Sequence, residues 1–158
     1  MKAALPLHLI KGNNGQISHI AVICSINGCD AMLIIDSGAS NCVLDVTRAS
    51  LFELAADNSF GNEVAVGLGS GNIHSSLSRA ELFALGDIEI KYFPFVMLDL
   101  SIINDTFREY GSIEIDGIIG TDLLLACDAK IDYKQKKLFL KGNKRRLQKV
   151  FKHPFQFH

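Results

Sequence analysis

An acidic residue, Asp36, ends an apolar run and is followed directly by Ser37 and Gly38. The run before it, residues 33–35, contains two β-branched residues and predicts a buried strand. Burying a lone charge is costly, so the pattern indicates a carboxylate held at a rigid strand end, where it can serve in acid–base catalysis. Taken alone, the same pattern also fits a strand that leaves the core through an Asx-type turn.

A second pattern lies far downstream, where the β-branched pair Ile118 and Ile119 runs into Gly120 and then into a short helical pattern. The two patterns in this order resemble the retropepsin-like aspartic proteases, the single-lobed relatives of pepsin. The resemblance covers roughly residues 18 to 141. Ser37 stands where many family members carry Thr, and both residue types supply a hydroxyl.

The resemblance implies a mainly β fold, a closed barrel-like acid protease domain with one or two short helices. It also implies an aspartic endopeptidase, in which two carboxylates share one proton and activate one water. The chain has one Asp-Ser-Gly, so the second carboxylate is expected from another copy. An isologous dimer brings Asp36 of each subunit to the two-fold axis.

The resemblance further implies a role for each neighbour of Asp36. Ser37 is expected to hydrogen-bond across the dimer axis, and Gly38 to let the substrate backbone approach. The glycine-rich stretch 67–71 predicts a hairpin tip, which corresponds to the flap that closes over a bound peptide. The residues expected to contact the substrate are Ala39, Gly69, Ser70, Gly71, Ile118 and Ile119. No metal and no cofactor is expected.

Two other interpretations remain open from the sequence. The first is a catalytically inactive retropepsin-like module that binds a peptide or protein, since a fold does not dictate a function. The second is an unrelated small β-barrel binding module in which both patterns are coincidental. The mass of the particle and a cleavage assay separate the enzyme from both alternatives.

The composition is that of one ordinary globular domain: 158 residues, 48% hydrophobic and 21% charged, with a formal net charge of −1. No apolar run approaches the roughly 20 residues of a membrane span, so no membrane is expected. The cysteines, Cys24, Cys29, Cys42 and Cys127, lack metal-site spacing and indicate reduced thiols in a cytoplasmic protein. Only Cys24 and Cys29 could pair, across a hairpin at Asn27-Gly28.

The remaining pattern predicts short strands and two helices. Strands are expected over residues 4–10, 17–26, 31–35, 41–44, 63–68, 73–85, 88–100 and 113–120, and a final hairpin over 129–133 and 137–140. Helices are expected over 45–56, capped by Asp45 or Thr47, and over 121–127, capped by Thr121. Residues 101–112 are mixed in character and partly helical. Asp116 precedes the second core turn and is interpreted as a structural residue.

The last residues, 142–158, are predicted to be a basic tail outside a protease domain of residues 1–141. Eight Lys or Arg and no acid lie between residues 136 and 152. Such a run is more often a solvated helix face or a flexible end than a nucleic-acid site, so nucleic acid is not a favoured partner. The core is therefore expected to fold without the tail.

Overall fold

The structure, a computed structural model, describes residues 1–55 and 76–152. Its strands are β1 (Lys2–Pro6), β2 (His8–Lys11), β3 (Ile17–Ile26), β4 (Cys29–Ile35), β5 (Val43–Asp45), β6 (Ser76–Leu85), β7 (Ile88–Leu98), β8 (Gly117–Ile119), β9 (Lys130–Asp132) and β10 (Lys137–Lys141). Its helices are the 3₁₀ segments η1 (Asn13–Gly15) and η2 (Val46–Phe52), and the α-helices α1 (Ser101–Glu109), α2 (Thr121–Ala126) and α3 (Lys144–Lys152).

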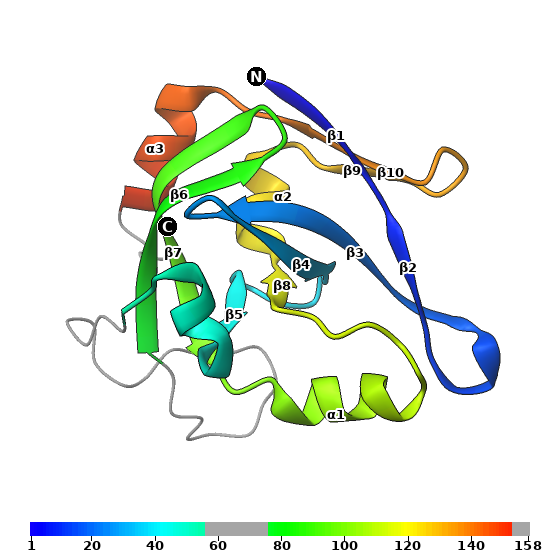
Figure 1. The fold of residues 1–158 in the computed structure, drawn as a ribbon. Coiled ribbons are helices and arrows are strands. Elements are labelled where there is room, and N and C mark those ends of the chain that lie inside the picture. Colours follow the sequence, from blue (N-terminus) through cyan, green and yellow to red (C-terminus); the bar gives the residue numbers. More distant parts are fainter. Residues whose placement is uncertain (56–75, 153–158) are drawn as a thin grey trace.

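Six strands close into a barrel in the order β3-β4-β8-β5-β7-β6, and β2 pairs with the first half of β3 (Figure 1). The barrel closes where Ser25 and Ile26 of β3 pair with Ala84 and Phe83 of β6. These two residue pairs join the first and last strands of the barrel. The expected mainly β, closed architecture is confirmed, although the described residues contain three α-helices rather than one or two.

A separate three-stranded sheet, β1-β10-β9, joins the beginning of the chain to its later part. β1 pairs with β10 over its whole length, from Lys2 with Lys141 to Pro6 with Lys137. The N-terminal ammonium of Met1 donates to the carbonyl of Gly142 at 2.7 Å. The first residues of the chain are therefore held against the segment that leads into α3.

The hairpin between β3 and β4 forms where the sequence predicted it. Asn27 and Gly28 have φ values of 50° and 83°, and two positive φ values in succession suit a tight two-residue hairpin turn. The Asn27 side chain also donates to Phe52 O at 2.8 Å and accepts from Leu82 N at 3.1 Å. The turn is thereby fixed to two other elements, and β4 leaves it toward Asp36.

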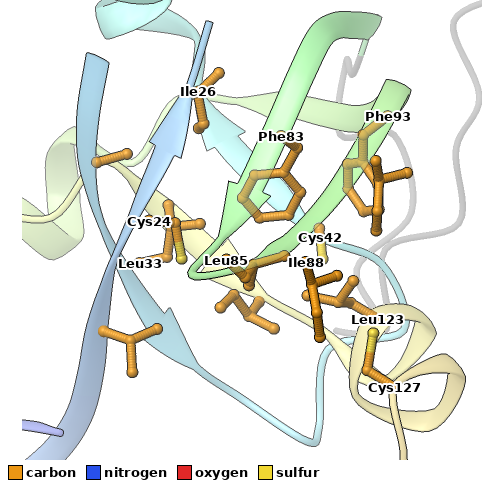
Figure 2. Close-up of a cluster of buried hydrophobic side chains, with 14 of the residues drawn as sticks. Cys24, Ile26, Leu33, Cys42, Phe83, Leu85, Ile88, Phe93, Leu123 and Cys127 are labelled. Carbon is orange, nitrogen blue, oxygen red and sulfur yellow. The ribbon is translucent and has the colours of Figure 1, made fainter. Parts of the chain in front are cut away.

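The main core is aromatic and aliphatic, and it includes three of the four cysteines (Figure 2). The rings of Phe83 and Phe93 have centroids 4.8 Å apart, and both contact Phe95. All four cysteines are free thiols, so the disulfide considered for the β3–β4 hairpin is not formed. Burial raises the thiol pKa of Cys24, Cys42 and Cys127, which keeps these groups protonated as small apolar side chains.

Residues 144–152, which were expected to belong to a basic tail, form the helix α3, and this helix packs against the core. Leu147 and Phe151 of α3 are buried, and the ring of Phe151 lies 4.7 Å from that of Phe93. The side chain of Gln148 bonds both the backbone N–H and the carbonyl of Lys91, at 2.6 and 3.0 Å. The two apolar residues are four apart, so they share one helix face and bury it together.

Two local expectations change in detail. The helix expected over 45–56 is the shorter 3₁₀ segment η2, and Asp45 caps it by accepting from Thr47 N at 3.0 Å. The mixed stretch 101–112 contains α1. The strand expected over 63–68 lies outside the described residues. Within residues 1–55 and 76–152, no helix is long and apolar enough to cross a membrane.

Candidate active site

Asp36 follows directly after β4, beside the end of β8. The two strands run parallel, with Ile34 opposite Ile118 and Ile35 opposite Ile119. The backbone N–H of Asp36 continues this pairing and donates to Ile119 O at 3.0 Å. The barrel wall therefore fixes the main chain of Asp36, whose side chain is exposed.

The turn after Asp36 orients its carboxylate. Gly38 N donates to Asp36 Oδ1 at 2.8 Å, and Ala39 N donates to Asp36 O at 3.2 Å. A Cβ atom on Gly38 would lie 3.1 Å from Asp36 Oδ1, which is closer than ordinary contact, so glycine suits this position. In the described part of the chain, Asp36 Oδ2 accepts no hydrogen bond, which leaves it open to a water or ligand.

A second segment, at the start of α2, clamps this turn. Thr121 N donates to Ala39 O at 2.8 Å, and Thr121 Oγ1 donates to Ser37 O at 2.7 Å. A Cβ atom on Gly120 would lie 2.6 Å from the carbonyl oxygen of Asn41, so only glycine allows this approach. The expectation that Thr121 caps α2 is wrong: Gly120 is the N-cap and the hydroxyl is directed to Ser37.

We expect Thr121→Val to loosen the Asp36 turn, because valine keeps the shape of threonine but removes the hydroxyl. Loss of one neutral hydrogen bond should lower the free energy of unfolding by about 1 kcal/mol. The amide NMR signal of Gly38 should shift as well, since its N–H bonds the carboxylate within the clamped turn. Thr121→Ser, which keeps the hydroxyl, should leave that signal in place; equal shifts in both variants would contradict the clamp.

Asp122, the residue after Thr121, fixes Cys42, which lies six residues after Asp36. Its Oδ2 accepts from Cys42 N at 3.1 Å, and its Oδ1 accepts from Leu123 N at 2.8 Å and from Cys42 Sγ at 3.2 Å. Gly120 N donates to Cys42 Sγ at 3.4 Å. Desolvation by burial raises the pKa of Asp122, although these hydrogen bonds act in the opposite direction.

We expect Asp122 to make stability depend on pH with a defined sign. Its pKa is raised in the folded state, so its stabilising contribution is complete below the pKa of the unfolded chain. That contribution is lost as the pH rises through the folded-state pKa. Asp122→Asn has no such proton, so the melting temperature of the wild type minus that of the variant should fall as the pH rises above about 4, the ordinary pKa of an aspartate. A difference that stays constant or grows would contradict the raised pKa.

The predicted site residues differ in how exposed they are in the structure. Asp36, Ser37 and Gly38 share one exposed turn, and Ala39 is half-buried beside them. Ile118 is partly exposed, whereas Ile119 has no exposed surface and belongs to the main core. Ile119 therefore supports the turn through its backbone, and its side chain is not available to a ligand in this chain.

Two further predictions concern the flap and Asp116. Gly69, Ser70 and Gly71 lie outside the described residues, so the flap stays a prediction. Asp116 is structural, as expected: it accepts from Met32 N at 2.8 Å and from Arg48 at 3.2 Å.

Sequence reasoning missed the clamp formed by Thr121, Asp122 and Cys42. A signal was present, because two polar residues follow directly after the apolar strand that ends at Gly120. Their target could not be read from the sequence, since it depends on the parallel pairing of β4 with β8. Across residues 1–55 and 76–152, no group of three His, Cys, Asp or Glu side chains could hold a metal ion.

Comparison with known proteins agrees with this geometry. The model of the aspartyl protease family matches residues 22–123, more than half of the chain. No curated protein matches the chain.

Two solved structures share the retropepsin-like fold of this chain. A retropepsin-like aspartic protease from Rickettsia conorii is 15% identical, with a TM-score of 0.53 and 89% of each chain covered. The retroviral protease-like domain of Ddi1 from Leishmania major is 23% identical, with a TM-score of 0.52, over 79% of this chain and 90% of that one.

Proposed function

The chain belongs to the aspartyl protease family, and on this premise we propose that it is an aspartic endopeptidase that acts as a symmetric homodimer. The observation that carries the proposal is the state of Asp36. Its main chain is anchored to β8, one carboxylate oxygen is fixed by Gly38 N–H, and the other is open. A pre-oriented, exposed carboxylate on a rigid strand end is what acid–base catalysis on a bound peptide requires.

The dimer supplies the second carboxylate. In the described part of the chain, no hydrogen bond or ion pair joins Asp36 to another acidic side chain. A two-fold axis beside the exposed turn would bring Asp36 and its symmetry mate together. Two carboxylates that are close enough to hydrogen-bond to each other cannot both be ionised, so the pair holds one proton. Ser37, exposed on the same turn, is suited to bond across the axis.

The reaction then follows from this single proton. The ionised carboxylate takes a proton from a water, whose oxygen attacks the scissile carbonyl carbon, while the protonated carboxyl gives its proton to the carbonyl oxygen. The tetrahedral intermediate collapses as the C–N bond breaks: the leaving nitrogen takes the proton held by one carboxyl, and a hydroxyl of the intermediate gives its proton to the other carboxylate, which restores the singly protonated pair. No metal or cofactor takes part in this sequence.

The substrate is an extended peptide that pairs with the protein as an added strand. Ala39 and Ile118, which keep exposed surface beside the turn, would contact it, and the flap of residues 69–71 would cover it. The hydrogen bonds from Thr121 serve the reaction as well, because they hold the Asp36 turn in place, and a misplaced catalytic group lowers the rate steeply. A cytoplasmic location remains a prediction of the sequence.

The dimer is tested by sedimentation together with cleavage of a peptide library at several protein concentrations. We expect a species near twice 17.3 kDa at micromolar concentration, and a specific activity that falls on dilution as the dimer dissociates. Pepstatin should inhibit cleavage. A protein that stays monomeric and cleaves nothing at any pH would favour the inactive, peptide-binding alternative.

A further inference from the structure

The outer face of α3 concentrates positive charge. The segment 136–152 holds eight of the 16 Lys and Arg residues of the chain and none of its 17 Asp and Glu residues. α3 itself contributes five of these cations, all exposed: Lys144, Arg145, Arg146, Lys149 and Lys152. The rest of the chain is acidic overall, so the charge is segregated rather than dispersed.

Among the residues that the structure describes, these cations have no acidic partner in an ion pair. The ion pairs of residues 1–55 and 76–152 all involve Arg48 or Arg108, neither of which lies on α3. Arg145, Lys149 and Lys152 are spaced i, i+4 and i+7, so they form one stripe along the exposed side of the helix. With a rise of 1.5 Å per residue, that stripe is about 10 Å long.

Helix stability explains only part of this arrangement, because Lys149 and Lys152 lie in the last turn, where the helix dipole favours cations, whereas other features oppose it. Like charges three or four residues apart repel each other, and Arg145–Lys149 and Lys149–Lys152 are such pairs. Lys144 and Arg145 also lie in the first turn, where the helix dipole disfavours positive charge. A helix that only had to cover β7 would be more stable with acidic residues at several of these positions. The charge therefore indicates an external anionic partner.

A residue with an exposed aromatic side chain lies near the C-terminal end of this helix. Tyr92 of β7 is 63% exposed and has a φ of 55°, a conformation that bulky residues rarely adopt. The Arg79 guanidinium donates to Tyr92 O at 3.0 Å, to Phe151 O at 3.2 Å and to Lys152 O at 3.3 Å. The backbone of Tyr92 is thus held near the C-terminal end of α3 through Arg79.

We propose that α3 and Tyr92 form a binding surface for single-stranded nucleic acid. Stripes of cations that follow a phosphate backbone, beside an aromatic ring on which a base stacks, are the general means of binding such strands. An anionic membrane fits less well, because the apolar face of α3 is buried in the core and cannot insert into lipid. An acidic protein segment would use the cations but has no need for the exposed ring.

The test is binding of the full chain to a fluorescent 20-nucleotide polyuridine RNA, followed by anisotropy at several salt concentrations. The variant Arg145→Gln/Lys149→Gln/Lys152→Gln removes the stripe, and Lys11→Gln/Lys130→Gln/Lys134→Gln removes the same charge from exposed sites elsewhere. Loss of three phosphate contacts should make the slope of log K against log salt less negative by about 2. It should also weaken binding by about tenfold or more at about 50 mM salt. The control triple should bind like the wild type.

Tyr92 is tested separately with two variants. Tyr92→Asn removes the ring but tolerates a positive φ, and we expect binding to weaken by about tenfold, whereas Tyr92→Phe should bind normally. Equal weakening by the two triple variants, or equal binding by the two Tyr92 variants, would overturn the proposal. Stronger, stripe-dependent binding to phosphatidylserine vesicles or to polyglutamate than to the RNA would overturn it in favour of a membrane or an acidic protein. None of these readouts depends on protease activity.

Discussion

Asp36→Asn is expected to abolish peptide cleavage at every pH while the fold and the dimer persist. Asparagine keeps the shape of aspartate and can still accept the hydrogen bond from Gly38 N–H, but it cannot exchange a proton. In a symmetric dimer the substitution removes both carboxylates at once. Acid–base catalysis of this kind contributes roughly 10²–10⁴-fold, and loss of the activated water adds to that.

Mixing subunits makes this test sharper. When wild-type chains are mixed with an excess of Asp36→Asn chains, most wild-type subunits enter heterodimers with a single carboxylate, so activity should fall well below that of the wild type alone. An excess of Thr121→Ser chains, which keep Asp36 and the hydroxyl, is the matched control and should not inhibit. Unchanged activity in the first mixture would show that each subunit works independently.

Truncation after Lys141 is expected to prevent stable folding, because it removes two buried side chains at once. Leu147 has no exposed surface and Phe151 is 4% exposed. Truncating one leucine or phenylalanine in a core costs about 2–5 kcal/mol, and a whole domain is stable by only about 5–15 kcal/mol. Leu147→Ala, as the milder variant, should lower the free energy of unfolding by about 2–5 kcal/mol in urea titrations.

The control for this prediction lies on the same helix. Val150 is 46% exposed, so Val150→Ala should change the free energy of unfolding by less than about 0.5 kcal/mol. If residues 1–141 alone unfold cooperatively at the urea midpoint of the full chain, α3 is an appendage and the original boundary at residue 141 is right.

The features that could be predicted from the sequence are those set by local chemistry. The Asn27-Gly28 turn, the strand that ends at Asp36 and the cap at Asp45 each depend on a few neighbouring residues. The role of Thr121 was missed because its hydroxyl acts on Ser37, 84 residues away. That contact exists only after β4 and β8 have paired.

Two further features of the structure were missed although the sequence carries signals for them. The burial of Leu147 and Phe151 was not predicted, because residues 142–158 are strongly basic. Their four-residue spacing is nevertheless that of a buried helix face. Ile118 and Ile119 were both assigned to the substrate surface. Successive side chains of a strand point to opposite faces, so only one of the two could lie there.

The distance between the two Asp36 carboxylates in a crystal of the full-length protein tests the central claim most directly. We expect a two-fold axis beside the Asp36 turn, with a carboxylate oxygen of each subunit about 3 Å from its mate, close enough to share one proton. The two Ser37 residues should lie in contact across the same axis. A dimer that holds the two Asp36 side chains apart, on separate surfaces, would contradict the proposed catalytic pair.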